Sequence, residues 1–69
     1  MEPIWTLTEP GTLSLSGTRF AVVMREPGDY RVWFDGKQAA CSGSYSVLSS
    51  ARQGVLDLVA ETLEMGLEP

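Results

Sequence analysis

Residues 19–36 decide the fold, and they read RFAVVMREPGDYRVWFDG. Both halves of this stretch are rich in β-branched and aromatic side chains, and apolar residues alternate along them as they do in β-strands. The Glu-Pro-Gly-Asp sequence at 26–29 predicts a turn between the halves, because Pro restricts φ and Gly permits a positive φ. Asp35-Gly36 is typical of a two-residue hairpin turn. We therefore predict an antiparallel hairpin that a third strand continues.

The loop length decides how the two strands of this hairpin pair. A two-residue loop would place Val23 opposite Val32, and a three-residue loop would place Val22 opposite Phe34. We favour the three-residue loop, because it keeps apolar side chains together on one face of the sheet.

Further strands are expected on both sides of the hairpin. Residues 12–16 alternate between apolar and polar side chains, which predicts a half-buried strand, and residues 37–42 would return as the third strand of the meander. Residues 1–11 carry large apolar side chains, including Trp5, between two prolines. They are expected to form either a short edge strand or an arm that packs on the sheet.

The C-terminal part of the chain predicts one helix over residues 51–65. Its apolar residues recur every three or four positions, which produces a stripe that can pack on the sheet. Ser50 and Gln53 have the spacing of a capping box at the start of a helix. Gly66 suits the left-handed position directly after a helix.

Together these elements predict an α+β fold in a single small domain, with an antiparallel three- or four-stranded sheet (a meander) and one C-terminal helix packed on one face. The expected order is an N-terminal arm at 1–11, the β-meander at 12–42, a loop at 43–50, the helix at 51–65 and a tail at 66–69. A chain of 69 residues buries only a small core, so dimerisation or docking onto a partner is an expected source of further burial.

The composition excludes several classes of enzyme and metal site. The chain contains no His and one Cys, so it lacks an imidazole base, a Ser-His-Asp triad, an internal disulfide and a Cys-rich zinc site. We expect no enzymatic activity, no cofactor and no metal, and we expect Cys41 to be a reduced, half-buried thiol. The first residues lack the pattern of a signal peptide, and no apolar run has membrane-spanning length. These features predict a cytoplasmic protein with no membrane contact.

The acidic side chains form a pattern on the predicted helix. The chain has five basic and nine acidic side chains, for a net charge of -4. Asp57, Glu61 and Glu64 are spaced four and three residues apart, so they share one side of a helix. Carboxylates near a helix C-terminus oppose the helix dipole. The pattern indicates either a surface that binds a basic partner or a solvated face that keeps a small protein soluble.

The basic residues concentrate in the predicted sheet. Arg19, Arg25 and Arg31 share a predicted face with Trp33, and one helix cannot cover both faces of the sheet. A tryptophan with arginine neighbours is typical of protein interfaces, and it can also stack on nucleic-acid bases. The alternative is that the N-terminal arm folds over this face and buries it. We predict that Arg25, Arg31 and Trp33 bind a partner.

Residues 20–27, followed by Arg31-Val32-Trp33 and the helix, resemble the AP2 or phage-integrase arm-binding fold. In that family the sheet lies in the DNA major groove and the helix packs behind it, so the resemblance implies a sheet-face nucleic-acid-binding module. The similarity covers residues 19–34 and the helix. The chain departs from that shape in its added third strand and in its acidity, which disfavours binding to phosphates.

Our leading hypothesis is a non-catalytic protein-interaction module, a small acidic inhibitor or adaptor that occupies a basic surface of a larger protein. Compact acidic chains without catalytic motifs are common among phage and mobile-element accessory proteins that block defence machinery. An anti-defence (anti-CRISPR-like) protein is therefore the specific form suggested by analogy. The alternatives are the nucleic-acid-binding module, which the net charge disfavours, and a homodimer joined through the Trp33 face or a strand edge.

Overall fold

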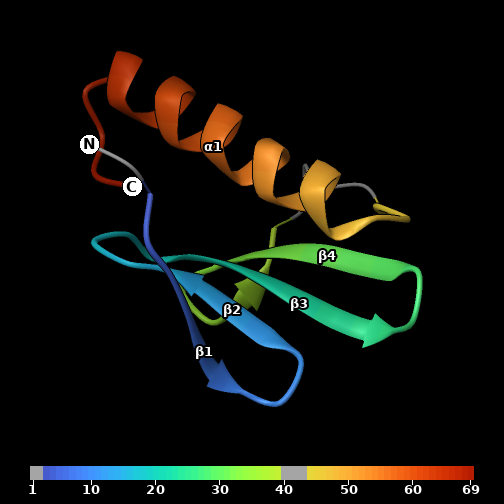
Figure 1. The fold of residues 1–69 in the computed structure, drawn as a ribbon. Helices are drawn as coiled ribbons and strands as arrows, with labels where there is room; N and C mark the ends of the chain where they lie inside the picture. The colour runs from blue at the N-terminus through green and yellow to red at the C-terminus, as the bar shows by residue number, and fades with distance from the viewer. Residues whose placement is uncertain (1–2, 40–43) are drawn as a thin grey trace.

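A computed structural model describes residues 3–39 and 44–69 as one five-stranded sheet with a single helix across it (Figure 1). The elements are β1 (Trp5–Glu9), β2 (Thr12–Leu15), β3 (Phe20–Glu26), β4 (Asp29–Phe34), β5 (Lys37–Gln38) and α1 (Leu48–Glu64). Each strand pairs antiparallel with its neighbours in the sequence, so the sheet is a meander. The predicted α+β fold, with one C-terminal helix on one face of an antiparallel sheet, is confirmed, and the sheet has five strands where three or four were predicted.

The additional strand comes from the predicted N-terminal arm. β1 pairs with β2 along the edge of the sheet (Figure 1), and Trp5 lies opposite Leu15. Trp5 packs against the core, and the guanidinium carbon of Arg52 in α1 lies 5.8 Å from the centroid of its ring. The edge strand is therefore confirmed and the covering arm is wrong. Pairing along β2 satisfies backbone groups that an arm crossing a sheet face would leave without partners.

Both predicted registers of the β3–β4 hairpin are wrong. The turn has two residues, with Glu26 opposite Asp29, but the register shifts at Arg25, so Val22 lies opposite Val32. This bulge moves the pairing by one residue and restores the continuous apolar face that a two-residue loop alone would have disrupted. The predicted division of the β3 and β4 side chains between the two faces is observed for this reason.

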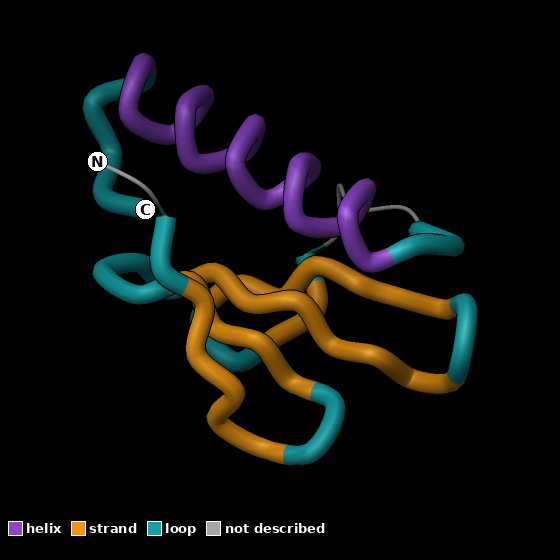
Figure 2. Tube along the Cα trace, viewed as in Figure 1, coloured by secondary structure: helices purple, strands orange, loops and turns teal. Residues whose placement is uncertain are grey.

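The core lies between α1 and one face of the sheet. Its buried side chains are Leu15, Phe20, Val22, Val32, Ala51 and Val55. The rings of Phe20 and Phe34 pack together with their centroids 4.7 Å apart. Because α1 occupies one side of the sheet (Figure 2), no element of the described residues crosses the opposite side. We call that opposite side the free face.

α1 begins three residues before its predicted start. Val47 precedes the helix with an extended backbone and no side chain caps the first turn, so the predicted capping box of Ser50 and Gln53 is wrong. Nε2 of Gln53 instead donates a hydrogen bond of 3.0 Å to Oδ1 of Asp57. The earlier start packs Leu48 against the core. Leu48 is half-buried there, and the apolar area that it removes from water stabilises the earlier start.

The end of α1 agrees with the prediction for Gly66. This residue has a φ of 77°, and its N–H donates to the carbonyl oxygen of Leu63 at 3.0 Å. The N–H of Leu67 donates to the carbonyl oxygen of Thr62, also at 3.0 Å. These two bonds form a Schellman motif, which ends the helix and turns the tail back toward the sheet (Figure 1).

A glycine inside α1 makes room for an aromatic ring. Tyr45 precedes the helix, and its backbone forms two hydrogen bonds with Tyr30, with N···O distances of 2.8 and 2.9 Å. A Cβ atom on Gly54 would lie 2.9 Å from Cζ of the Tyr45 ring. Gly54 therefore allows the segment before α1 to pack against the helix.

We expect Gly54→Ala to lower the free energy of unfolding by about 1 kcal/mol, because overpacking costs more than the roughly 1 kcal/mol gained in helix propensity. Urea unfolding followed by circular dichroism measures the change. In a Tyr45→Ala background the same substitution should stabilise the protein. Stabilisation by Gly54→Ala with Tyr45 still present would contradict the steric role of the ring.

Two sequence predictions lie outside the described residues: the third strand at 40–42, beyond β5, and the half-buried thiol of Cys41. No helix in the described residues has the length and apolarity needed to cross a membrane.

Candidate interaction surfaces

The three acidic residues predicted for α1 lie on its solvent side. Asp57, Glu61 and Glu64 are all exposed, and we call them the acidic stripe. The last turn of α1 contains no basic residue. Within residues 3–39 and 44–69, the one ion pair joins Arg31 and Asp29, so no described cation is ion-paired with the stripe. The stripe is thus available to an external cation.

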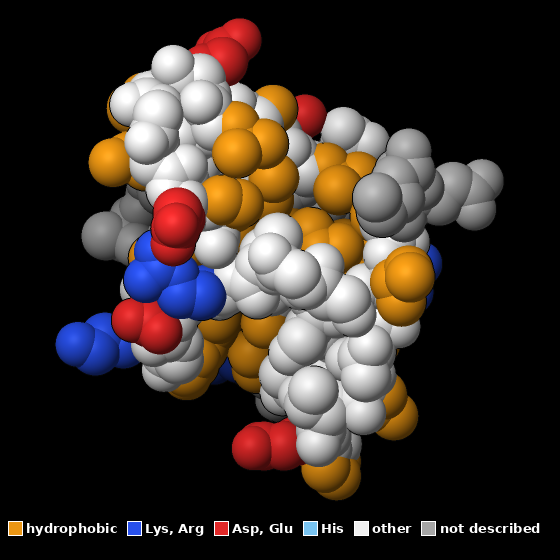
Figure 3. Space-filling view, turned by 90° about the vertical axis from the view of Figure 1, so that its left-hand side faces the viewer, with side chains coloured by type: hydrophobic (Ala, Val, Ile, Leu, Met, Phe, Trp, Pro, Cys, Tyr) orange, Lys and Arg blue, Asp and Glu red, His pale blue; other side chains and the backbone are white. Residues whose placement is uncertain are grey.

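An apolar patch lies at the same end of α1. Leu63, Met65 and Leu67 are 59%, 68% and 58% exposed, and we call them the C-terminal patch. Figure 3, which looks at this end of the molecule, shows apolar side chains exposed between charged ones. The patch was not predicted from the sequence, because the turn at Gly66 brings Leu67 to this end only in the folded chain.

A groove runs between α1 and the β4–β5 end of the sheet. It has a volume of about 670 Å³, and its apolar lining includes Phe34, Ala39 and Leu58. Glu61 lines the groove from α1, and Lys37 lines it from β5. The groove thus extends the apolar surface beneath the C-terminal patch and carries both signs of charge.

The predicted set of arginines does not assemble on one face. The guanidinium group of Arg19 lies 4.7 Å from the centroid of the Phe34 ring, on the core side of the sheet, and donates a 3.1 Å hydrogen bond to the carbonyl oxygen of Glu68. Arg25 is exposed at the bulge. Arg31 keeps the place beside Trp33 that the pattern predicted, whereas Arg19 precedes β3 and its guanidinium is held by the C-terminal tail.

Arg31 is engaged within the protein. Its Nε donates a 2.9 Å hydrogen bond to Oδ1 of Asp29, and Ser44 Oγ donates to the same oxygen at 3.0 Å. The hydrogen bond from Arg31 holds the pKa of Asp29 below its usual value of 3.8. A nucleic-acid-binding role on this face would have to compete with the Asp29 carboxylate for the Arg31 guanidinium.

This pair predicts a small acid sensitivity. Because the folded-state pKa of Asp29 is lowered, its carboxylate contributes stability above the unfolded-state pKa, and this contribution is lost as the pH falls through the folded-state pKa. We expect Asp29→Asn to destabilise the protein at neutral pH and to reduce the loss of stability below about pH 4. Urea midpoints at neutral and acidic pH measure both effects, with Asp57→Asn as the control. An equal acid response in Asp29→Asn and wild type would contradict this role.

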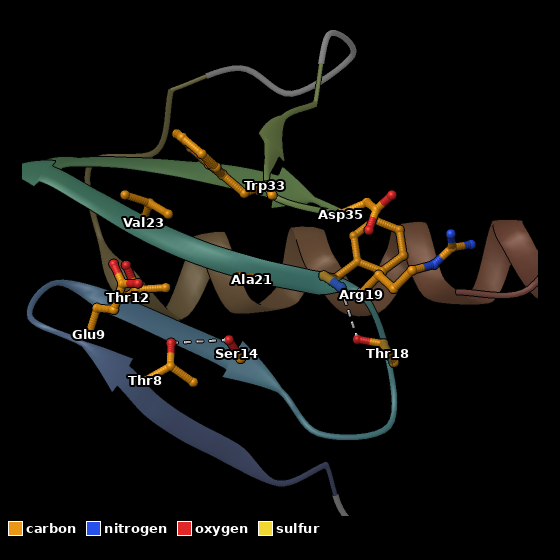
Figure 4. Close-up of a pocket in the computed structure, with 12 residues that line it drawn as sticks. Thr8, Glu9, Thr12, Ser14, Thr18, Arg19, Ala21, Val23, Trp33 and Asp35 are labelled. Carbon is orange, nitrogen blue, oxygen red and sulfur yellow. Dashed lines mark hydrogen bonds between the residues drawn. The ribbon is translucent and has the colours of Figure 1, made fainter.

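The free face contains a hollow that we call the sheet hollow. It has a volume of about 510 Å³, and its lining includes Thr8, Ser14, Ala21 and Trp33 (Figure 4). The small side chain of Ala21 lies between Ser14 on β2 and Trp33 on β4 in the strand register. Sequence reasoning identified Trp33 but missed the hollow. The small residue Ala21 within a strand of larger residues was a possible signal of a hollow. Its neighbours on the adjacent strands could not be identified, however, because they depend on the strand register.

Two carboxylates also line the sheet hollow. Glu9 is at the end of β1, and Asp35 is in the turn between β4 and β5, where it has a φ of 53°. Figure 4 shows them at opposite ends of the hollow. The indole Nε1 of Trp33 is buried and has no hydrogen-bond acceptor among the described residues.

Comparisons with protein-family models, with curated proteins and with solved structures gave no match to this chain. The resemblance of residues 19–34 to the AP2 or integrase-arm fold therefore stays a prediction. The surfaces described above are the basis for assigning a function.

Proposed function

We propose that the protein is a non-catalytic interaction module whose acidic stripe binds a basic surface of a larger protein. The observation that carries this proposal is the placement of Glu61 and Glu64 in the last turn of α1, where both are exposed and neither forms an ion pair with a described residue. Carboxylates at this end cost a helix about 0.3–1 kcal/mol each. Cations of a partner would remove this cost and provide electrostatic attraction, which supports a binding role for the stripe.

The C-terminal patch supports the same proposal. A stable protein interface combines a desolvated apolar centre with a charged rim that directs association. Leu63, Met65 and Leu67 supply exposed apolar area next to the carboxylates. A partner that contacts both features would bury apolar surface and also gain charge complementarity, whereas a stripe that served only solubility would need no adjacent apolar patch.

The specific form that we propose is an inhibitor or adaptor that acts by occupying its partner's basic surface. The small size, the acidity and the absence of His support this form. Phage and mobile-element proteins that block defence machinery, such as anti-CRISPR proteins, are the analogy on which this specific form rests. Self-association through the edge of β1, where Leu7 is 67% exposed, is a separate proposal that sedimentation equilibrium tests.

Affinity capture from the native host with charge-matched variants tests the proposed function. One variant carries Asp57→Asn, Glu61→Gln and Glu64→Gln. Its control carries lysine in place of three exposed serines, Ser16, Ser46 and Ser49. Both variants are three charges less negative than the wild type, whose net charge is -4. We expect the wild type and the serine variant to retain the same partner and the neutralised stripe to lose it. Equal capture by both variants would contradict the role of the stripe.

A further inference from the structure

We propose that the sheet hollow is a binding site for an arginine side chain of the basic partner. This inference rests on the proposed function for the basic character of the partner, but it assigns a second surface, on the opposite side of the sheet from α1. The partner would thus contact the molecule on two sides, at the acidic stripe and at the hollow.

The shape of the hollow results from one small residue. Ala21 is half-buried on the central strand β3, and its register neighbours on the free face are Ser14 and Trp33. Because alanine ends at Cβ, the larger side chains on both sides form walls around it. The volume of about 510 Å³ is within the usual range for sites that bind small ligands, roughly 300–1,000 Å³. An extended side chain entering from a partner fits such an open hollow.

The charges at the hollow favour a cation. Glu9 and Asp35 are both exposed at its border. Arg19 also lines the hollow, but its guanidinium packs on the Phe34 ring and donates to the carbonyl oxygen of Glu68. The guanidinium of Arg31 is paired with Asp29. The two carboxylates are therefore not neutralised within the described residues. A phosphate would be repelled, which disfavours nucleic acid as the occupant, and an apolar side chain would leave the carboxylates without a partner.

The remaining lining favours arginine among cations. Trp33 supplies an aromatic surface for a guanidinium plane, and stacking of this kind contributes about 0.5–1 kcal/mol at exposed sites. Thr8 and Ser14 supply hydroxyl oxygens 3.4 Å apart on the facing wall. Both can accept hydrogen bonds. Guanidinium has five N–H donors in a rigid plane, so it can stack and donate at the same time, which a lysine ammonium group cannot do as well.

Titration of the ¹⁵N-labelled protein with the blocked peptide Ac-Ala-Arg-Ala-Arg-Ala-NH₂ tests the site. The matched probes replace both arginines of the peptide with lysine or with neutral citrulline. We expect millimolar binding of the arginine peptide, with shifts of the Trp33 indole signal and the Ala21 amide signal, weaker shifts with lysine and none with citrulline. Trp5→Phe assigns the indole signals. Equal shifts with citrulline would overturn the charge argument.

Two variants of the protein locate the binding. Ala21→Leu fills the hollow, whereas Ala21→Ser keeps it open, and we expect about tenfold weaker binding only in the first. Should Ala21→Leu fail to fold, Glu9→Gln with Asp35→Asn serves instead, because Asn tolerates the positive φ of Asp35. The doubly neutralised variant should also bind about tenfold more weakly, and Glu26→Gln should bind normally.

Two outcomes separate this inference from the proposed function. Shifts confined to the acidic stripe would overturn the arginine site and leave the proposed function intact. Absence of any shift at Ala21 and Trp33 at millimolar peptide would also overturn the site. The capture experiment would then still test the proposed function, because its three substitutions lie in the acidic stripe and leave the residues of the hollow unchanged.

Discussion

Replacement of Phe20 by alanine is expected to unfold most of the protein at room temperature. Phe20 is 5% exposed, and its ring packs against the tilted ring of Phe34 at the edge of the core. Removing a buried phenylalanine costs about 3–5 kcal/mol, and a domain of this size rarely has more than about 3–5 kcal/mol of stability. The substitution also removes the ring that packs against Phe34, and the guanidinium of Arg19 lies over the Phe34 ring. The contact between the sheet and the C-terminal tail is thereby weakened.

Circular dichroism and the dispersion of amide proton signals measure this effect. Leu63→Ala is the control, because Leu63 is 59% exposed and its loss should change stability by less than about 0.5 kcal/mol. Phe20→Leu keeps most of the buried volume and should leave a folded but less stable protein. A Phe20→Ala variant that unfolds cooperatively near the wild-type temperature would show that Phe20 is not central to the core.

Reversing the charge of the acidic stripe is expected to abolish partner binding and to stabilise the protein. The variant carries Asp57→Lys, Glu61→Lys and Glu64→Lys. Lysine in the last turn of α1 interacts favourably with the helix dipole, so the free energy of unfolding should rise by about 1 kcal/mol at low salt. For a domain of this size such a change raises the melting temperature by about 4–8 °C. Binding should be lost because the stripe would then repel a basic surface.

Thermal unfolding at low and high salt, together with capture of the partner, measures both effects. Ser49→Lys is the control for the interaction with the helix dipole. It introduces the same residue in the first turn of α1, where a cation opposes the dipole, so its effect on stability should have the opposite sign. Loss of binding together with loss of stability would indicate unfolding rather than a role in recognition. Retained binding at low salt would show that the stripe does not bind the partner and serves only solubility.

Local signals predicted the parts of the fold that depend on neighbouring residues. Alternation in β3 and β4 identified their faces, because side chains in a strand point alternately to each side. Gly66 predicted the end of α1, because the turn needs a positive φ. Asp57, Glu61 and Glu64 were correctly placed together, because residues three and four apart share one side of a helix. Each of these features depends on a few adjacent residues.

Features that depend on packing across the chain were predicted less well. The start of α1 followed the burial of Leu48 rather than the Ser50 capping signal. The hairpin register depended on a bulge at Arg25 that no turn residue marks. The guanidinium of Arg19 is held at Phe34 and not on the predicted face, because the C-terminal tail, distant in sequence, supplies its hydrogen-bond acceptor.

The sequence by itself thus determined the helix and the central strands, the apolar faces of β2, β3 and β4, the acidic side of the helix and the absence of histidine chemistry. Only the tertiary structure decided that residues 5–9 extend the sheet as β1, that Ala21 opens a hollow beside Trp33, and that Leu67 joins the C-terminal patch. Periodicity and turn geometry are properties of a few consecutive residues. The surfaces proposed to bind the partner arise from segments that meet only when the whole chain packs, since their neighbours are set by register and burial.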